Sequence, residues 1–333
     1  MERPYFEGCA SLAVRDRKDI TRPWRYPVYY CHLWLDYPQG VEIFRAHERC
    51  YSRPMPFENR HLSPLVASVV LHHSDFGQLR SLLESLARAA VIAGLHRLPV
   101  ICVDQSLHEP YSTEAQSLCQ GLDGQQDLEI HYIRRDINPG YGAGHNRAFE
   151  AASGRYQLIL NPDVELSEHA LKNALRTLDE NDQIGLLVPV GYDVAGQREC
   201  LAKGYPSVSV LGLRAFAPAW LRRLFEPSLS RYELRDQPAQ TDLREITLAS
   251  GCCMWVRRDL LDQVGGFNED FFLYFEDYDL SLRIADLASV VEHQEIAIVH
   301  HGGAAAQKGL RHQLWFVAGA VRFFNRWGWR WFG

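Results

Sequence analysis

Short apolar runs separated by helical segments constrain the fold of this chain more than any other feature. Each run has the length and the content of branched aliphatic residues of a strand buried on both faces. Leucines at helical spacing between the first two runs predict an amphipathic helix over residues 76–93. Because such alternation is typical of βαβ units, we predict an α/β fold with a mainly parallel sheet flanked by helices. The predicted strands are residues 65–73, 99–106, 128–135, 155–163 and 184–193.

The segments outside these runs set the predicted domain organisation. Scattered prolines without a helical or strand period indicate an irregular N-terminal extension. A helix is expected to begin at Ser167, a good N-cap residue, and residues 207–241 mix arginines with aromatic residues as in a mobile or amphipathic insert. The predicted parts are an extension over residues 1–63, one domain over 64–305 with halves 64–190 and 191–305, and an aromatic, basic helical segment over 306–333.

Charge and composition exclude several classes of protein. With 35 basic against 41 acidic residues the chain has a net charge of −6, which argues against a nucleic-acid partner. No apolar run approaches the roughly 18–20 residues of a membrane-spanning helix, and the N-terminus lacks the apolar core of a signal peptide. The eight cysteines show no metal-binding spacing and are expected to be reduced. We therefore expect a cytoplasmic protein.

Polar residues follow two of the predicted strands at their carboxyl ends, where parallel sheets bind ligands. Asp104 ends VICVD, and Asn161 and Asp163 end LILNPD. Divalent cations such as Mg²⁺ and Mn²⁺ prefer oxygen ligands, so Asp163 is a candidate metal ligand and Asn161 a weaker, neutral one. An Asx turn is the alternative explanation of Asn-Pro-Asp.

The loop NPGYGAGHN, residues 138–146, is rich in glycine. Glycines allow backbone amides to approach a ligand closely, and a helix beginning at about Asn146 would direct its positive N-terminus at a phosphate. The alternative is a flexible turn between strand and helix. Further along, AIVHHGG ends a strand in two histidines that cannot point the same way, and His300 rather than His301 continues the apolar register.

Three carboxylates follow the aromatic run in FFLYFEDYDLSLR, residues 271–283. Glu276 and Asp277 are expected in the first turn of a helix, where the macrodipole would stabilise them as simple capping residues. Asp279 and Arg283 are four residues apart and predict an ordinary surface ion pair. The other explanation is an acid-base centre, because burying carboxylates is costly unless they are paired or used.

In their order along the chain, these segments resemble family 2 glycosyltransferases of the GT-A fold, and most of all bacterial rhamnosyltransferases of lipopolysaccharide or surface polysaccharide assembly. The resemblance spans about Val66 to Gly303, and its most specific part is the long run from SGCCM to LSLR. It rests on VVLHH, VICVDQS, NPGYGAGHN, LNPDV, SGCCMWVRRDLLDQVGGFNEDFFLYFEDYDLSLR and AIVHHGG.

The resemblance implies a role for each matching position. Asp277 would be the general base, with Glu276 beside it placing the acceptor. Asp163, with His300 as a possible further ligand, would hold Mn²⁺ or Mg²⁺ at the diphosphate. Contacts with the nucleotide sugar are implied for Asp104, Asn138, Gly140, Gly142, Asn146 and Asn161.

The implied reaction is inverting transfer of a sugar by direct displacement. The expected donor is dTDP-L-rhamnose and the expected acceptor an oligosaccharide or lipid-linked glycan of the cell surface; a UDP-hexose or UDP-N-acetylhexosamine donor is the alternative. A non-catalytic protein that binds nucleotide sugars is a third hypothesis. Two positions depart from the family pattern: Asn161 stands where Asp-x-Asp has its first Asp, and His145 stands where the rhamnosyltransferase-like branch has a second Asn.

The C-terminal stretch LWFVAGAVRFFNRWGWRWFG combines aromatic residues with Arg322, Arg326 and Arg330. Such a segment could lie at the cytoplasmic face of the inner membrane, which would suit a lipid-linked acceptor. A helix packed on the catalytic domain is the alternative.

Overall fold

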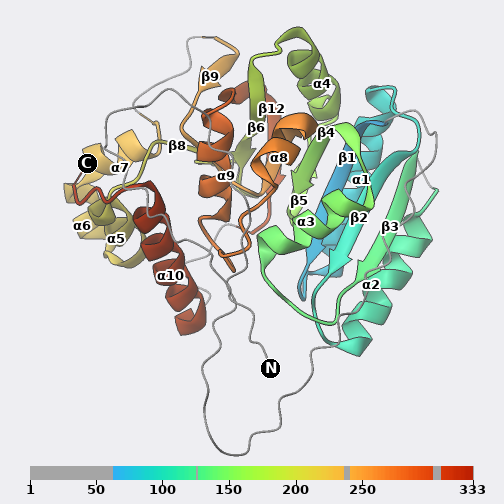
Figure 1. The fold of residues 1–333 in the computed structure, drawn as a ribbon, viewed down its shortest axis with the longest axis horizontal. Coiled ribbons are helices and arrows are strands. Elements are labelled where there is room, and N and C mark those ends of the chain that lie inside the picture. Colours follow the sequence, from blue (N-terminus) through green and yellow to red (C-terminus); the bar gives the residue numbers. More distant parts are fainter. Residues whose placement is uncertain (1–62, 125–126, 236–240, 303–308, 333) are drawn as a thin grey trace, which may run out of the picture. The chain divides into compact units, whose positions relative to one another are not determined.

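The computed structural model describes residues 63–124, 127–235, 241–302 and 309–332 (Figure 1). These residues all belong to one compact unit, Arg53–Gly333. The predicted extension over residues 1–63 lies outside the described residues except for Ser63, and the predicted boundaries after residues 63, 190 and 305 stay predictions. Within the described part of the chain, no helix combines the length and the apolar character needed to cross a bilayer.

A ten-stranded sheet forms the centre of this unit, in the order β3-β2-β1-β4-β11-β6-β12-β5, with β7 and β9 at its sides. β1 pairs in parallel with β2 and β4, whereas β11 runs antiparallel between β4 and β6. The predicted fold class, α/β with a mainly parallel sheet flanked by helices, is confirmed. The strands are β1 Ser63–Leu71, β2 Leu98–Asp104, β3 Leu128–Arg134, β4 Gly154–Leu160, β5 Val164–Leu166, β6 Ile184–Tyr192, β7 Arg198–Glu199, β8 Ala202–Lys203, β9 Leu243–Glu245, β10 Leu248–Ala249, β11 Cys253–Arg257 and β12 Ser289–His300.

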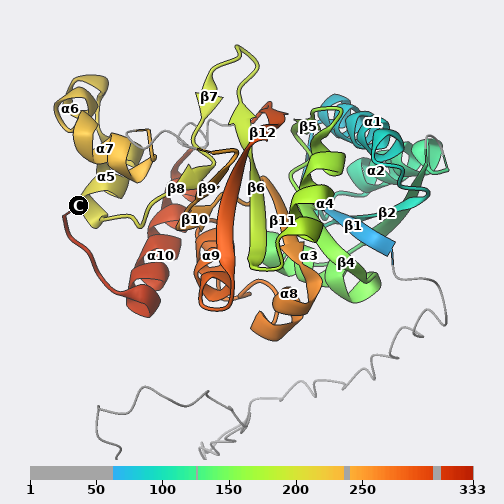
Figure 2. The ribbon, with the colours of Figure 1, turned by 90° about the horizontal axis from the view of Figure 1, so that it is seen from above.

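Helices cover both faces of the sheet (Figure 2). Side chains of α1, α2 and α4 belong to the core on one face, and those of α3, α8 and α9 to the core on the other. Both cores are apolar because the central strands are buried on both sides, as their sequences predict. The helices are α1 Phe76–Ile92, α2 Glu109–Leu122, α3 Tyr141–Ala151, α4 Ala170–Glu180, α5 Val208–Phe216, α6 Ala219–Leu224, α7 Glu226–Tyr232, α8 Arg258–Val264, α9 Glu276–Ala285 and α10 Gly309–Trp327.

The helix predicted over residues 76–93 is confirmed as α1, and two other predicted helix starts are wrong. α4 begins at Ala170 rather than at Ser167, because the amide of Ser167 donates to the carbonyl of Ala297 and ties this residue to β12. α3 begins at Tyr141 rather than near Asn146, directly after Gly140, whose φ of 115° ends the loop. The second half of the glycine-rich loop is therefore helical.

A third apolar core lies beside the sheet and joins α5, α7, α9 and α10. The stretch expected as a mobile or amphipathic insert forms three short helices, with residues 236–240 outside the described residues. The hydroxyl of Ser207 caps α5 by accepting from the amide of Val210 at 3.2 Å. Phe323 of α10 is fully buried in this core, so the C-terminal helix packs on the elements that precede the Glu276–Asp277 pair.

Candidate active site

A strained turn places Glu276 and Asp277 at the start of α9. Tyr274 and Phe275, the two preceding residues, have φ angles of 72° and 70°, a left-handed conformation that bulky residues rarely adopt. Packing holds the turn: the Phe275 ring lies 5.2 Å from that of Phe316, and the Tyr274 hydroxyl is 2.9 Å from His312 Nδ1. The turn directs both carboxylates to one side of the helix start.

Asp277 bridges α9 and the turn before β11. Its Oδ2 accepts from the amide of Gly251 at 3.0 Å and its Oδ1 from the amide of Tyr278 at 2.9 Å, while part of the side chain faces open space. Burial raises the pKa of Asp277, and Lys203 and the Gly251 amide oppose that rise. Burial and the neighbouring Asp277 raise the pKa of Glu276 well above its usual range. Of the two, Asp277 is therefore the one that ionises more readily.

Both carboxylates line a cavity of about 310 Å³, the Asp277 pocket. Helices α5, α7 and α10 and the start of α9 form its walls, which combine aromatic rings with two cations. A cavity of this size with a few convergent polar groups is typical of a site for a small molecule or a sugar residue. The lining residues are Lys203, Leu211, Arg214, Ala215, Phe216, Tyr232, Ser250, Tyr274, Phe275, Glu276, Asp277, Tyr278, His312, Gln313 and Phe316.

Lys203 is a cation of the Asp277 pocket whose charge acts on Asp277. The sequence analysis did not single it out. Its side chain is buried, with Nζ 5.5 Å from the centre of the Tyr278 ring. Desolvation lowers the pKa of Lys203 to about 8, against an attraction from Asp277 that raises it. A lone lysine in β8 carries no sequence signal, because only the fold brings it to the pocket.

Asp163 and His300 meet at the ends of neighbouring elements. His300 Nε2 lies 3.5 Å from Asp163 Oδ1, and His300 Nδ1 lies 2.8 Å from Oε2 of Glu199, a residue that sequence reasoning did not single out. Burial lowers the pKa of His300, but hydrogen bonds to the two carboxylates outweigh it and raise the pKa to about 9. His301 instead lies 2.8 Å from Glu165.

The Asp163–His300 pair offers the ligand chemistry of a divalent cation. Carboxylate oxygen and imidazole nitrogen both suit Mn²⁺, and Mg²⁺ often uses one or two carboxylates with substrate phosphates. Among the described residues, no three His, Cys, Asp or Glu side chains are grouped so as to hold a metal ion by themselves. The donor set therefore fits a cation shared with a substrate. Gly302 keeps space here, since a Cβ on it would lie 1.8 Å from Asp163 Oδ2.

The turn over residues 250–252 connects Asn161, two residues before Asp163, to Asp277. The backbone amide of Asn161 donates to the carbonyl of Cys252 at 2.8 Å, and the backbone amide of Gly251 donates to the carboxylate of Asp277. The Tyr141 hydroxyl donates to the Gly251 carbonyl at 2.7 Å. The end of β4, the start of α3 and the start of α9 thus meet at one turn.

Asp104 is held by hydrogen bonds within the chain. Its Oδ1 accepts from the amide and hydroxyl of Ser106 at 2.9 and 2.5 Å, and its Oδ2 accepts from the hydroxyls of Ser112 and Tyr132, each at 2.6 Å. Burial opposes ionisation, but these bonds outweigh it and lower the pKa of Asp104. Asp104 fixes the loop after β2, and its contact with the nucleotide sugar stays a prediction.

The structure separates the residues of the glycine-rich loop. Asn138 Nδ2 lies 3.3 Å from Nδ1 of His72, at the end of β1, and Asn138 Oδ1 accepts from the amide of Gly140 at 3.1 Å. Asn146 instead uses both side-chain amide atoms on the loop after α8, accepting from the Phe267 amide at 2.8 Å and donating to the Phe267 carbonyl at 2.9 Å. Asn138 thus lies near the carboxyl ends of the strands, whereas Asn146 is held by hydrogen bonds to the backbone of Phe267.

Gly140 and Gly142 are required for close packing within the chain. A Cβ on Gly140 would lie 2.3 Å from the carbonyl oxygen of Phe272, and one on Gly142 would lie 2.7 Å from Cβ of Phe267. The carbonyl of Phe272 accepts from the amide of Tyr141 at 3.0 Å, so the start of α3 is fastened to the turn before α9. The glycines let these two segments touch.

We predict that Gly140→Ala lowers the free energy of unfolding by about 1–3 kcal/mol, because the new Cβ meets backbone at a positive φ. Chemical denaturation of the full chain measures this. Gly94→Ala is the control: Gly94 also has a positive φ, 69°, but nothing lies within 4 Å of its Cβ position. Equal losses in the two variants would contradict the role of the Phe272 contact.

The arrangement of strands, turn and carboxylates can be compared with known proteins. A family model described as glycosyl transferase family 2 matches residues 69–265, more than half of the chain. The chain belongs to glycosyl transferase family 2. The match begins near the end of β1, covers the glycine-rich loop, Asn161 and Asp163, and ends before the Glu276–Asp277 pair.

Two curated relatives of modest identity are glycosyltransferases by name. An N-acetylglucosaminyl-diphospho-decaprenol L-rhamnosyltransferase of Mycobacterium tuberculosis is 29% identical over 190 residues, 53% of this chain and 60% of that protein. A low-salt glycan biosynthesis hexosyltransferase of Haloferax volcanii is 25% identical over 164 residues, 46% of each chain. The match therefore spans about half to three fifths of these relatives.

Solved structures share the fold of this family 2 chain. GalNAc-T7 with UDP, GalNAc and Mn²⁺ superposes with a TM-score of 0.55 at 13% identity, covering 81% of this chain and 49% of that one. A mannosyltransferase from Pyrobaculum calidifontis in complex with GDP-Man and Mn²⁺ superposes with a TM-score of 0.50 at 16% identity, covering 79% and 65%. The predicted GT-A fold is thereby confirmed.

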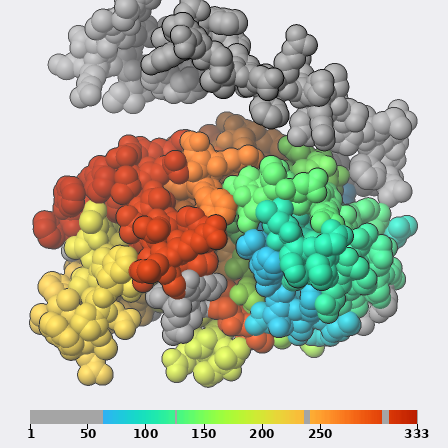
Figure 3. Space-filling view, turned by 90° about the horizontal axis from the view of Figure 1, so that it is seen from below, coloured from blue at the N-terminus to red at the C-terminus, as the bar shows by residue number. Residues whose placement is uncertain are grey.

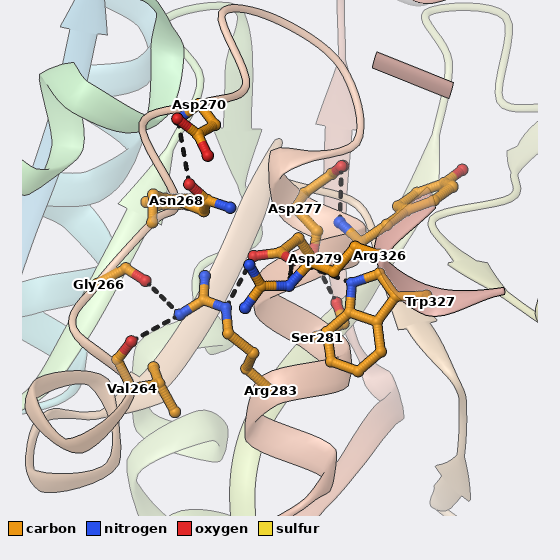
Figure 4. Close-up of polar contacts among 12 residues, drawn as sticks. Val264, Gly266, Asn268, Asp270, Asp277, Asp279, Ser281, Arg283, Arg326 and Trp327 are labelled. Atoms are coloured by element: carbon orange, nitrogen blue, oxygen red, sulfur yellow. Dashed lines mark hydrogen bonds and ion pairs between the residues drawn. The ribbon is translucent and has the colours of Figure 1, made fainter. Parts of the chain in front are cut away.

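The pair Asp279–Arg283 of this family 2 chain is buried, so the expected surface ion pair is wrong. Arg283 Nε lies 2.7 Å from Asp279 Oδ2, with side chains 12% and 0% exposed. Oδ1 of Asp279 accepts from Trp327 Nε1 at 3.0 Å and lies 3.0 Å from Arg326 Nε (Figure 4). Because Arg326 and Trp327 end α10, the network joins that helix to the one carrying Asp277.

Proposed function

We propose that this chain is an inverting glycosyltransferase that moves a sugar from a nucleoside diphosphate donor to an acceptor hydroxyl. The observation that carries the proposal is the position of Asp277. Its carboxylate faces the Asp277 pocket and is connected through the Gly251 turn to Asn161 and the candidate cation ligands. An acceptor in the pocket would therefore meet a donor bound at the strand ends.

In the proposed reaction Asp277 accepts the proton of the acceptor hydroxyl while that oxygen attacks the anomeric carbon. The bond from the anomeric carbon to the diphosphate breaks on the opposite face, which inverts the configuration without a covalent enzyme intermediate. Burial and the neighbouring Asp277 raise the pKa of Glu276 well above its usual range, and in its protonated form Glu276 can donate a hydrogen bond to the acceptor. Lys203 supports the ionised form of Asp277.

Asp163 and His300 are the residues proposed to hold Mn²⁺ or Mg²⁺, with Glu199 hydrogen-bonded behind His300. A bound cation would offset the charge of the departing diphosphate. The chain's own part is to orient the two ligands: Glu199 fixes the imidazole ring, and Gly302 leaves room around the carboxylate. The neutral Asn161 gives this site less negative charge than two aspartates would.

The proposed donor is dTDP-L-rhamnose and the proposed acceptor a lipid-linked or oligosaccharide glycan of the cell surface, at the cytoplasmic face of the membrane. The mycobacterial relative supports this choice, because it is named as an L-rhamnosyltransferase for N-acetylglucosaminyl-diphospho-decaprenol. A UDP-hexose or UDP-N-acetylhexosamine donor is the second candidate, favoured by the hexosyltransferase relative.

Thermal-shift measurement with dTDP or UDP, each with Mn²⁺, Mg²⁺ or EDTA, tests donor and cation together. A nucleotide at a hundredfold excess over Kd stabilises the folded state by about 2.7 kcal/mol, so dTDP with Mn²⁺ is expected to raise Tm by several degrees. Asp163→Asn should lose the cation-dependent part, whereas Asp182→Asn, whose side chain is 92% exposed, should retain it. A clear preference for UDP would contradict the rhamnose donor, and shifts unchanged by EDTA would contradict the cation.

The pH dependence of transfer follows from the raised pKa of Asp277. The base acts only when ionised, so kcat/KM should fall as the pH drops through that pKa, which lies above the usual value of about 4 for an aspartate. The acid limb of a kcat/KM profile measures it. A rate that stays constant down to pH 4 would contradict the assignment.

A further inference from the structure

Exposed apolar side chains gather on one part of the molecule. Among the residues that the structure describes, five of the large exposed hydrophobic side chains lie elsewhere, and these are scattered over separate segments. α6 is the clearest case: it buries no residue, and Trp220 and Leu224 are 68% and 69% exposed. Phe216 and Phe225 on either side of it are also exposed. Contiguous exposed apolar residues of this kind mark an interaction surface.

α10 contributes a second apolar stripe to the same part of the molecule. One side of this helix is packed through Phe323 and Phe324. Another side carries exposed residues at helical spacing, so it is apolar without facing the core. The exposed residues of that stripe are Leu310, Leu314, Val317 and Val321.

The C-terminal residues join the two stripes. The carbonyls of Arg330 and Trp331 accept from the amides of Val208 and Ser209, at 2.7 and 3.1 Å, which fastens the segment after α10 to the start of α5. Trp331 and Phe332 are 60% and 86% exposed. The space-filling view shows the two coloured regions next to each other, α5 to α7 in yellow and α10 in red (Figure 3). We call their exposed residues the α6–α10 surface.

Basic residues accompany this apolar surface. Residues 205–235 and 309–332 contain nine arginines against two glutamates, in a chain that has 35 basic and 41 acidic residues overall. On α6, Arg222 and Arg223 are exposed, and neither has a carboxylate within ion-pair distance among the described residues. The α6–α10 surface is thus positive and apolar, while the rest of the chain is acidic.

We propose that the α6–α10 surface docks on an anionic lipid bilayer. Apolar residues that enter the interface and arginines that meet anionic headgroups are the two attractions that hold proteins there. A second copy of the chain would place arginines against arginines. Residues 1–62, with ten basic and eight acidic side chains, do not complement the surface either.

Docking deepens the proposed function, because the same helices line the Asp277 pocket. Phe216 of α5 and Phe316 of α10 line the pocket beside the exposed residues of the surface. An acceptor whose tail stays in the bilayer could then present its sugar to Asp277. This consequence rests on the proposed transfer reaction, whereas docking itself does not.

Sedimentation of the full-length chain with vesicles tests the proposal. The chain should bind vesicles of phosphatidylcholine with about 30% phosphatidylglycerol and bind phosphatidylcholine alone much more weakly. Each arginine near an anionic surface contributes about fivefold to partitioning, so Arg222→Gln with Arg223→Gln should weaken binding at least about tenfold. Trp220→Ser with Leu224→Ser should also weaken it, and since α6 buries no residue these variants should fold normally.

The matched control replaces two arginines at the opposite end of the sheet. Arg80→Gln with Arg97→Gln removes two arginines whose side chains are 53% and 74% exposed, and binding should be unchanged. Transfer to a short water-soluble acceptor, measured in parallel, should be the same in all three double variants, which separates failed docking from a failed transfer proposal. Equal binding to neutral vesicles, no vesicle binding, binding unaffected by the α6 substitutions, or a dimer broken by them would overturn docking on anionic lipid.

Discussion

Asp277→Asn is expected to lower the rate of sugar transfer by about 10²- to 10⁴-fold while leaving nucleotide binding nearly intact. The amide has the shape of the carboxylate and can still accept from the Gly251 amide, but it cannot take the proton of the acceptor. Because burial raises the pKa of Asp277, the ionised side chain destabilises the folded state above that pKa. The neutral variant should therefore be at least as stable at neutral pH.

Asp286→Asn is the matched control for this prediction. Asp286 is exposed and follows the last residue of α9, so the same substitution occurs at the opposite end of one helix. Rates of transfer, nucleotide affinities and unfolding curves should match those of the unchanged chain. Unchanged turnover in Asp277→Asn would remove Asp277 from the mechanism, and loss of nucleotide binding would show a role in holding the donor.

Asp279→Ala is expected to lower the free energy of unfolding by about 3–5 kcal/mol, because it removes one partner of a buried ion pair. Arg283 would keep its hydrogen bonds to the carbonyls of Val264 and Gly266 but lose its carboxylate. Trp327 would lose its hydrogen-bond acceptor, so hydrogen exchange should rise at the end of α10 (Figure 4). Chemical denaturation and hydrogen exchange measure the two effects.

A second ion pair with the same four-residue spacing lies at the surface and serves as the control. Arg80 and Glu84 are also four residues apart, on α1, with side chains 53% and 43% exposed. Exposed pairs of this type contribute about 0.3–0.5 kcal/mol, so Glu84→Ala should change the unfolding free energy little. Similar losses for Asp279→Ala and Glu84→Ala would show that burial of the Asp279 network does not matter.

The fold could be predicted because strands and helices that are buried in a core have regular patterns of apolar residues in their sequences. Parallel strands covered on both faces need continuous apolar runs, and helices that cover them need apolar residues at helical spacing, as in α1. The predicted starts of α3 and α4 were wrong for reasons that the spacing of apolar residues does not record. One is the backbone of Gly140, and the other is the bond from Ser167 to the distant Ala297.

The candidate site is less visible in the sequence, because long-range contacts decide it. Asp163 and Asp277 stand out as acids after apolar runs, but Lys203 and Glu199 lie in short strands without a pattern. The left-handed turn before Glu276 arises at aromatic residues that favour other conformations, so packing against α10 must hold it. The burial of Asp279 likewise depends on Trp327, 48 residues later.

The most direct test of the central claim is to incubate the chain with a panel of nucleotide sugars and a cell-envelope extract, and to analyse the products by mass spectrometry and NMR. The proposal predicts that an acceptor gains one deoxyhexose from dTDP-L-rhamnose, with the anomeric configuration opposite to that of the donor, and that Asp277→Asn forms this product far more slowly. Transfer with retained configuration, or equal product from Asp277→Asn, would contradict direct displacement assisted by Asp277.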